Sequence, residues 1–437
     1  MISQETLSHL YATYVKTGKV TTDSRKITPG CLFFAFKGAN YDGNAFALQA
    51  LQQGAALCVV TDKKLQGNNG CVVVDDVTEA LQQLAIMHRQ HLQIPVIGIT
   101  GTNGKTTTKE LIHAVLARRY RVSATKGNLN NHIGVPLTLL EISPNTELAI
   151  VEMGANHPGE IAHLCTIANP THGLITNIGK AHLEGFGSED TIIQTKTALY
   201  RHVAANKGHI FVNADNKLLY QQALSITNND HIITYGQQPN VRFRGTHTTD
   251  NPFMSFYFEV GDNLFTTNSN LLGGYNFDNA MAAVSIGLYF HVEPFDIKEA
   301  IEEYTPSNQR SQLKRTLHNC LYLDCYNANP SSMAAAVASF QSMEGKHKMA
   351  IIGSMKELGV NSRHEHQILY DTLQSCHFDR LILVGPEFKD VCMTDGAMLF
   401  EDTAQVEEYL RQNRPSDSLI LIKGSNSNHL WTLADVL

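Results

Sequence analysis

The sequence lacks any segment suited to crossing a membrane or directing export. It contains no run of about 18 or more apolar residues. The basic residues and apolar core of a signal peptide are also missing from the N-terminal segment, MISQETLSHL. We therefore expect a cytoplasmic protein that has no membrane partner.

Cysteine is scarce, and basic residues do not predominate. The eight cysteines are scattered, and the closest pair, Cys320 and Cys325, is separated by four residues rather than the two of a zinc knuckle. We expect them to be reduced thiols, mostly in the core. Lys and Arg number 34 against 41 Asp and Glu, and the resulting charge of −7 argues against a protein that coats nucleic acid or anionic lipid.

The length indicates several domains. A chain of 437 residues is too long for one hydrophobic core, and a prior of roughly 150 residues per domain gives about three. The first part mixes short strand-like runs with helical stretches, and it closes with the helical pattern ALQQLAIMHRQHL before Pro95. We place the domains at 1–92, 93–306 and 307–437.

The second and third parts alternate strands and helices. VIGIT at 96–100 precedes a glycine loop and a helical pattern over 105–119, which predicts a parallel sheet covered by helices on both faces. Residues 241–272 instead have the pattern of an antiparallel meander, and TPSNQR at 305–310 is typical of a linker. A second alternating series from Leu317 predicts a Rossmann-like domain. The fold class is therefore α/β.

The segment GITGTNGKTTTKE at 98–110 is the strongest motif. A buried strand leads into a glycine-bearing turn and a helix, so backbone N–H groups and the helix N-terminus converge on a space the size of an anion. Lys105 adds a positive charge, and the hydroxyl of Thr106 or Thr107 can bind Mg2+. The motif therefore predicts a P-loop that binds a nucleotide.

One position of the strict P-loop pattern is not met. Ile99 stands where the pattern requires glycine, so Gly98 and Gly101 are expected to shape the turn. A glycine-rich connection without a ligand is the alternative, and the combination of glycine, Lys and Thr between a strand and a helix disfavours it. The expected ATP contacts in the loop are Gly101, Thr102, Asn103, Gly104, Lys105, Thr106 and Thr107.

The same residues resemble a known family. TGTNGKTTTKE is similar to the ATP-binding signature of the Mur ligases, which extend the peptide of a peptidoglycan precursor. Further resemblances span all three domains: TKGNLNNHIGVPLTLL, VEMGANHPGEI, TNIGKAHLEGFGS, DCYNANPSSM and KGSN. GANHPGEI and AHLEGFGS are typical of the branch that joins D-alanyl-D-alanine to UDP-N-acetylmuramoyl-tripeptide.

The resemblance implies an ATP-dependent ligase with a central P-loop domain. In such enzymes the γ-phosphoryl group of ATP passes to a carboxylate, and an amine attacks the resulting acyl phosphate. The N-terminal domain is then expected to bind the UDP end of the precursor, and the chain to be a monomer. Two alternatives remain open: a sibling ligase that adds a single amino acid, and a nucleotide-binding regulator without ligase activity. The presence of Lys105, Glu152, His182 and Lys196 argues against the regulator.

The resemblance also implies two Mg2+ ions. Thr106 and Glu152 would hold the first, as suits a hard cation. His182 would serve the second, together with a carbamate formed on Lys196. Because imidazole is an unusual Mg2+ ligand, a packed or solvent-facing histidine is the alternative at His182. A carbamate requires a neutral amine, so the pKa of Lys196 should be lowered, and a surface lysine is the alternative. Lys105, Glu152, His182 and Lys196 are the expected catalytic residues.

Other positions match the family's ATP-binding and substrate-binding residues. For Asn279 a plain helix start is the alternative, and for Arg310 an exposed linker arginine. The further ATP-binding candidates are Asn276, Asn279, Arg310, Asp324, Asn327 and Asn329. The substrate candidates are Ser24, Arg25, Lys37, Gly38, Thr125, Asn128, Asn130 and Asn131. For each of them a structural role is the alternative, since amides in a loop also stabilise turns.

The resemblance breaks in GSMKELG at 353–359. The family usually has an acidic residue where Ser354 stands, and here Lys356 lies beside Glu357. If the missing carboxylate orients D-alanyl-D-alanine, this chain binds the dipeptide differently or weakly. Contacts to the third residue of the tripeptide, lysine or diaminopimelate, do not follow from the sequence.

Overall fold

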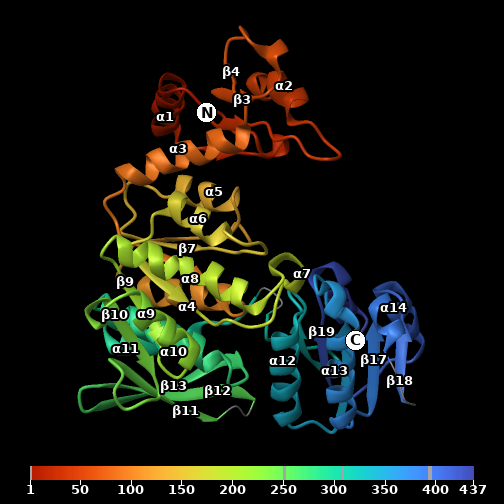
Figure 1. Cartoon of the computed structure of the whole chain (residues 1–437). Coiled ribbons are helices and arrows are strands. Elements are labelled where there is room, and N and C mark those ends of the chain that lie inside the picture. Colours follow the sequence, from red (N-terminus) through yellow and green to blue (C-terminus); the bar gives the residue numbers. More distant parts are fainter. Residues whose placement is uncertain (1, 250–251, 308–309, 392–395) are drawn as a thin grey trace.

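Three β-sheets follow one another along the chain in the computed structural model, which describes residues 2–249, 252–307, 310–391 and 396–437. Within these residues the sheets have four, nine and six strands. Figure 1 shows the unit with the first sheet above the central unit, and the C-terminal unit beside the lower part of the central one. The predicted α/β class with three units is confirmed.

The N-terminal unit is a small parallel sheet with helices packed on it. Its strands, in spatial as well as chain order, are β1 (Val20–Thr21), β2 (Leu32–Phe34), β3 (Leu57–Val60) and β4 (Cys71–Val73). Its α-helices are α1 (Gln4–Thr17), α2 (Ala47–Gln52) and α3 (Val77–His91). Short 3-10 turns are η1 (Ser24–Lys26), η2 (Gly43–Phe46) and η3 (Lys63–Leu65).

The central unit is built on the nine-stranded sheet, which is parallel from β5 to β11. Its strands are β5 (Val96–Thr100), β6 (Val122–Ala124), β7 (Leu148–Glu152), β8 (His172–Ile175), β9 (His209–Asn213), β10 (Ile232–Gly236), β11 (Phe243–Thr249), β12 (Phe253–Val260) and β13 (Asn263–Leu272). The spatial order is β13-β12-β11-β10-β9-β8-β5-β7-β6. The predicted meander is confirmed as antiparallel β11–β13, and it extends the parallel sheet through β10.

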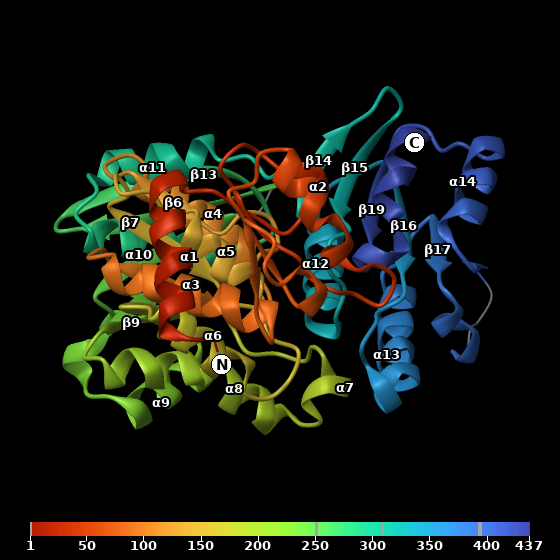
Figure 2. The ribbon, with the colours of Figure 1, turned by 90° about the horizontal axis from the view of Figure 1, so that it is seen from above.

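Helices cover both faces of the central sheet. They are α4 (Lys105–Leu116), α5 (Gly134–Leu140), α6 (Glu160–Ala168), α7 (Leu183–Phe186), α8 (Glu189–Ala205), α9 (Lys217–Ile226), α10 (Asn276–Tyr289) and α11 (Pro294–Glu303), with the 3-10 turn η4 (Asn229–His231). Helix α3 packs on α5 and α6, so one apolar core continues from the N-terminal unit into the central unit. The view from above places α1 and α3 over this part of the molecule (Figure 2).

The C-terminal unit has a six-stranded sheet that is parallel except for β14. Its strands are β14 (Gln312–Arg315), β15 (Asn319–Asp324), β16 (His347–Gly353), β17 (Arg380–Val384), β18 (Ala397–Phe400) and β19 (Ser418–Lys423), in the order β14-β15-β19-β16-β17-β18. Its helices are α12 (Pro330–Ser342), α13 (Ser362–Ser375) and α14 (Thr403–Gln412). The 3-10 turns are η5 (Gly359–Asn361), η6 (Pro386–Asp390), η7 (Asn426–Asn428) and η8 (Leu430–Asp435).

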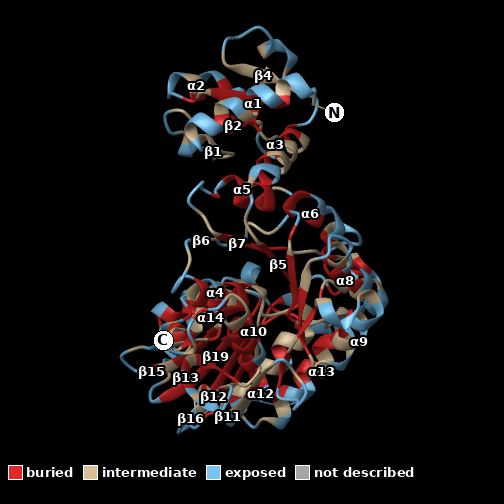
Figure 3. Ribbon diagram, turned by 90° about the vertical axis from the view of Figure 1, so that its left-hand side faces the viewer, coloured by how far each residue is buried: buried red, intermediate tan, exposed pale blue. Residues whose placement is uncertain are grey.

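The position of β5 determines where a ligand can bind. Strands β5 and β7 are buried along their whole length (Figure 3), because apolar residues cover both faces of a parallel sheet. Strand β5 pairs with β7 on one side and β8 on the other, and all three run parallel. The loops that follow these three strands therefore meet at one edge, the usual ligand-binding edge of such a sheet.

The remaining expectations concern the domain limits, the linker, the cysteines and membrane-spanning helices. The boundaries placed at 92/93 and 306/307 fall between α3 and β5 and between α11 and β14, and as domain limits they stay predictions. Positions 308 and 309 of the predicted linker lie outside the described residues. Seven cysteines of the described part are free, and Cys392 lies outside it. Among the described helices none is both long and apolar enough to cross a bilayer.

Candidate active site

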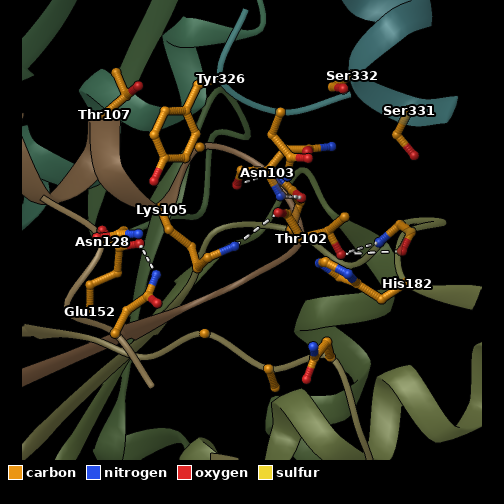
Figure 4. A pocket seen from close by; sticks show the side chains of 18 of the residues that line it. Thr102, Asn103, Lys105, Thr107, Asn128, Glu152, His182, Tyr326, Ser331 and Ser332 are labelled. Carbon is orange, nitrogen blue, oxygen red and sulfur yellow. Dashed lines mark hydrogen bonds between the residues drawn. The ribbon is translucent and has the colours of Figure 1, made fainter. Parts of the chain in front are cut away.

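A cavity of about 1160 Å3 lies at the carboxyl edge of the central sheet. Its wall includes Lys105, Glu152 and His182 from the central unit and Asp324 and Tyr326 from the C-terminal unit. In Figure 4 Tyr326 and the serines at the start of α12 face the P-loop across the open space. The cavity therefore requires both units.

The P-loop between β5 and α4 has a backbone that favours glycine. Gly101 and Gly104 have φ angles of +150° and +80°, and a Cβ would lie 1.9 Å from the Thr176 hydroxyl at Gly101 and 2.5 Å from the Asn279 side chain at Gly104. Within the described part of the chain no side chain caps the N-terminus of α4, so its first N–H groups can bind an anion. The expectation that Gly98 shapes the turn is wrong, because Gly98 lies inside β5, where a Cβ would meet Met153.

The segment 176–179, which follows β8, holds the P-loop in place. The backbone N–H of Asn103 donates to the Asn177 side chain (2.9 Å), and the Thr176 hydroxyl donates to the Asn103 carbonyl (2.6 Å). The Thr102 hydroxyl donates to the Gly179 carbonyl (3.2 Å) and accepts from the Gly179 N–H (3.0 Å). The loop is therefore preformed.

Lys105, the first residue of α4, lines the cavity next to the P-loop. Its Nζ donates to the carbonyls of Gly101 (2.7 Å) and Thr102 (3.0 Å), and Figure 4 shows the bond to Thr102. Burial lowers the pKa of Lys105 to about 8; Glu152 opposes this shift and Arg310 adds to it. A polyanionic ligand would favour the charged ammonium of Lys105. The charged ammonium in turn attracts phosphate groups.

Glu152, the last residue of β7, holds a buried carboxylate beside the loop. Only 1% of the residue is exposed. Its carboxylate accepts from the Thr106 hydroxyl (2.9 Å) and the Asn130 amide (2.8 Å), and its N–H donates to the Thr125 hydroxyl (2.9 Å). A carboxylate next to a hydroxyl fits Mg2+. Within the described residues no group of three His, Cys, Asp or Glu could enclose a metal alone, so a Mg2+ ion here would be completed by waters and phosphate oxygens.

Lys196 and His182 both lie near the P-loop and near the Phe186 ring. The Lys196 Nζ is 3.1 Å from the Gly101 carbonyl, and the residue is only 3% exposed. Burial and the nearby Lys105 lower the pKa of Lys196 to about 7, so the surface-lysine alternative is wrong. His182 has φ +51° and lines the cavity, with its Nδ1 paired with Glu357 of the C-terminal unit. Burial lowers the pKa of His182, and Glu357 opposes that shift.

The C-terminal unit contacts the P-loop directly through Asn329. Asn329 caps α12 with its side chain, which accepts from the Ser332 N–H (2.9 Å). The Asn329 amide also donates to the Asn103 side chain (2.8 Å). One asparagine therefore starts the helix and joins the two units.

Arg310 and Asp324 lie on the C-terminal wall of the cavity, as does Asn327. The Arg310 guanidinium stacks on the Tyr326 ring at 3.8 Å, and its buried Nε has no hydrogen-bond partner among the described residues. Asp324 forms an ion pair with the buried Lys423 (2.6 Å). Arg310 is half-buried against an aromatic ring, so the exposed-arginine alternative is wrong.

The two asparagines of α10 line the cavity, but their side chains are bound within the protein. The Asn279 amide donates to the Asn276 side chain (2.8 Å), and its oxygen accepts from the Thr108 hydroxyl (2.9 Å). Asn276 donates to the Leu272 carbonyl (2.8 Å). Asn279 therefore joins α10 to α4, and Asn276 joins the start of α10 to the end of β13.

The expected substrate residues fall into two groups. Asn128, Asn130 and Asn131 line the cavity, and Thr125 is buried behind Glu152. The Asn131 side chain accepts from two backbone N–H groups at the start of α5, which is the turn role left open above. Ser24, Arg25, Lys37 and Gly38 do not line the cavity and belong to the N-terminal unit; Arg25 pairs with Asp23 (2.8 Å) and Lys37 with Asp42 (3.7 Å).

Sequence reasoning did not single out several residues of the cavity wall. Asn177, Tyr326 and Glu357 belong to segments that resemble the family, but only the folded structure shows that their side chains reach the cavity. Lys423 was placed in the KGSN segment, and its pairing with Asp324 was not foreseen. Nothing in the sequence indicates which residues of a matched segment face inward.

The fold and the site together define a nucleotide-binding enzyme of the P-loop class with a third α/β unit across the cavity. Family models for three parts match the chain: the catalytic domain of the Mur ligase family at residues 17–99, the Mur ligase middle domain at 99–287, and the Mur ligase glutamate ligase domain at 309–426. The chain belongs to the Mur ligase family.

Similar proteins include two named UDP-N-acetylmuramoyl-tripeptide--D-alanyl-D-alanine ligase. The one from Bacillus subtilis (strain 168) is 35% identical over 94% of this chain and 91% of its own length. The one from Escherichia coli (strain K12) is 32% identical over 93% and 91%. Among solved structures, MurF from Acinetobacter baumannii is 31% identical with a TM-score of 0.85, covering 96% of this chain and 93% of that one. MurF ligase from Thermotoga maritima in complex with ADP is 26% identical with a TM-score of 0.83, covering 96% of both.

Proposed function

We propose that this protein is an ATP-dependent ligase that joins D-alanyl-D-alanine to UDP-N-acetylmuramoyl-tripeptide in peptidoglycan precursor synthesis. The observation that carries the proposal is the cavity in which the P-loop, the buried Glu152 and the C-terminal wall meet. Relatives of that name, similar along nearly their whole length, support the same substrates. An ADP complex of a similar ligase supports ATP as the nucleotide.

The reaction proceeds in two steps. The terminal carboxylate of the tripeptide attacks the γ-phosphorus of ATP, which forms an acyl phosphate and releases ADP. The amine of the dipeptide then attacks the acyl carbon, loses a proton, and expels inorganic phosphate. The first step brings a carboxylate against a polyanionic nucleotide, and the second expels a phosphate anion, so positioning and positive charge contribute more than a protein nucleophile would.

The P-loop residues have the first role. The N–H groups at the start of α4 and the Lys105 ammonium hold the β- and γ-phosphates, and the bracing by residues 176–179 keeps them aligned. Arg310, stacked on Tyr326, provides a second cation from the C-terminal wall. Its buried, unpaired Nε indicates that a ligand oxygen completes its hydrogen bonds.

Mg2+ fits beside the P-loop. Glu152 and the Thr106 hydroxyl would hold one ion, which supplies charge neutralisation between the phosphates. We place a second ion near His182 and a carbamate on Lys196, formed when the neutral amine adds to CO2 and releases a proton. The buried position and lowered pKa of Lys196 support this modification.

Other assignments complete the proposal. Asn276, Asn279, Asp324, Asn327 and Asn329 border the nucleotide, and Asn128, Asn130 and Asn131 border the muramoyl peptide, with Thr125 behind them. Ser24, Arg25, Lys37 and Gly38 bind the UDP end at the N-terminal unit. We expect a cytoplasmic monomer.

Phosphate release by the purified chain tests this function. ATP, Mg2+, D-alanyl-D-alanine and a UDP-muramoyl-tripeptide with either lysine or diaminopimelate should release phosphate, and Lys105→Met should not. Release with meso-diaminopimelate and UDP-muramoyl-dipeptide, but not with D-alanyl-D-alanine, would support the sibling ligase. ATP binding without release from any pair would support the regulator.

A further inference from the structure

A second, smaller cavity of about 260 Å3 adjoins the main one. His182, Tyr326, Asn327 and Glu357 line both cavities, so the two share a wall at the site of the proposed chemistry. Pockets for drug-sized ligands begin at about 300 Å3, so the smaller cavity suits a ligand as small as two alanines.

The charges around the second cavity suit a zwitterion. Of the described residues that line it, Lys356 is the one Lys or Arg, and Glu357 is the one Asp or Glu. Glu357 belongs to the shared wall, whereas Lys356 lines only the smaller cavity. A ligand with its amine toward the main cavity and its carboxylate away from it would match both charges.

The loop that carries these two residues is held at several points. It follows β16, where the Ser354 N–H donates to the Val384 carbonyl (2.8 Å). The Met355 N–H donates to Nε2 of the fully buried His366 (3.0 Å), whose Nδ1 donates to the Ser362 carbonyl (2.7 Å). Because Nε2 accepts a hydrogen bond while Nδ1 donates one, the His366 ring is neutral. These two bonds fix the loop backbone.

Glu387, in η6, fixes the Lys356 side chain. Its carboxylate forms an ion pair with the Lys356 ammonium. Burial would raise the pKa of Glu387, but hydrogen bonds from Lys356 and Ser354 lower it overall. Glu387 therefore brings a carboxylate next to Ser354, the position at which this chain lacks the family's usual acid.

We propose that Lys356, positioned by Glu387, binds the free carboxylate of the incoming dipeptide in the second cavity, while Glu357 receives its amine at the shared wall. The inference rests on the proposed function and adds a specificity determinant to it. The enzyme then selects an amine substrate by its distant carboxylate as well as by its amine. A dipeptide without that charge leaves Lys356 without its ligand.

The test compares D-alanyl-D-alanine with D-alanyl-D-alanine amide, which has the same shape but no carboxylate. For the wild-type chain we expect kcat/KM for phosphate release to be about tenfold or more higher with the acid, as for the loss of one charge-assisted hydrogen bond. In Lys356→Met the preference should fall to near unity, with the KM for ATP unchanged. Glu387→Gln should weaken the preference, because it leaves Lys356 in place but unanchored.

Lys389→Met is the matched control. Lys389 pairs with Glu401 (2.5 Å) in the same unit and lines neither cavity, so its loss should leave the preference intact. A thermal melt of each variant confirms that it folds. Ligation by wild type with no preference for the acid, or a full preference in Lys356→Met, overturns the inference while the proposed function stands. No ligation of D-alanyl-D-alanine by wild type overturns both.

Discussion

We expect Lys196 to lower the free energy of unfolding of this protein at neutral pH. Its ammonium is buried beside the P-loop, and burial with the nearby Lys105 lowers its pKa from 10.5 to about 7. An unfolded chain binds this proton more tightly than the folded protein does between these pH values. The folded state is therefore less stable at pH 7 than at pH 10 by the cost of giving up that proton.

The size of the effect follows from the two pKa values. At pH 7 the proton linkage costs about 4 kcal/mol. Lys196→Met keeps the length of the side chain and removes this cost, but it leaves the Gly101 carbonyl without the donor at 3.1 Å, a loss of about 1 kcal/mol. The variant should be more stable by about 3 kcal/mol at pH 7. For a domain of roughly 200 residues, such as the central unit, this corresponds to a rise of roughly 6–12 °C in Tm.

Thermal melts at pH 7 and pH 9.5 in buffer free of CO2 measure this difference. The gain in Tm should shrink at pH 9.5, because the free-energy cost of keeping Lys196 neutral in the folded state falls as the pH approaches the unfolded-state pKa of 10.5. Ligation by Lys196→Met should be abolished, and excess bicarbonate should not restore it. Lys217→Ala, at the exposed start of α9, should change neither property. An equal gain at both pH values, no gain, or full activity in Lys196→Met would refute the reasoning.

Three further outcomes are expected. Gly104→Ala should weaken ATP binding about tenfold or more in calorimetry because its Cβ has no room, whereas Gly261→Ala, at φ +59° in open space, should bind ATP normally; equal loss in both would contradict this. Glu152→Gln should reduce phosphate release about 100-fold or more and shift its Mg2+ dependence to higher concentration, and an unchanged Mg2+ curve would argue against metal binding there. Asn329→Ala should destabilise the C-terminal unit by about 1 kcal/mol through loss of the α12 cap, which a wild-type melting curve would exclude.

The elements that define the site could be predicted from sequence because their patterns are strong. The apolar run VIGIT coincides with β5 at Val96–Thr100, and the glycines and Lys105 follow in the order that a P-loop needs. Three short edge strands, β1, β14 and β18, were not predicted. β14 is the polar segment QLKR, and its pairing with β15 arises from tertiary contacts rather than from an apolar pattern.

The less predictable part of the site is its C-terminal wall. A motif such as DCYNANPSSM indicates a matched segment, but only the packing of one unit on another decides which side chains face the nucleotide. Asp324 forms an ion pair with Lys423, and the Asn279 side chain forms two hydrogen bonds within the protein. The pairings of Asp324 with Lys423 and of Asn279 with Thr108 join residues about 100 or more positions apart, where sequence periodicity gives no information.

Isotope transfer tests the central claim, ligation through an acyl phosphate, most directly. UDP-muramoyl-tripeptide labelled with 18O in its terminal carboxylate is incubated with the purified chain, ATP, Mg2+ and D-alanyl-D-alanine, and the released phosphate is analysed by mass spectrometry. We expect one 18O atom from the peptide in each phosphate, because the carboxylate oxygen leaves with the phosphoryl group. Ligated product accompanied by unlabelled phosphate would contradict it.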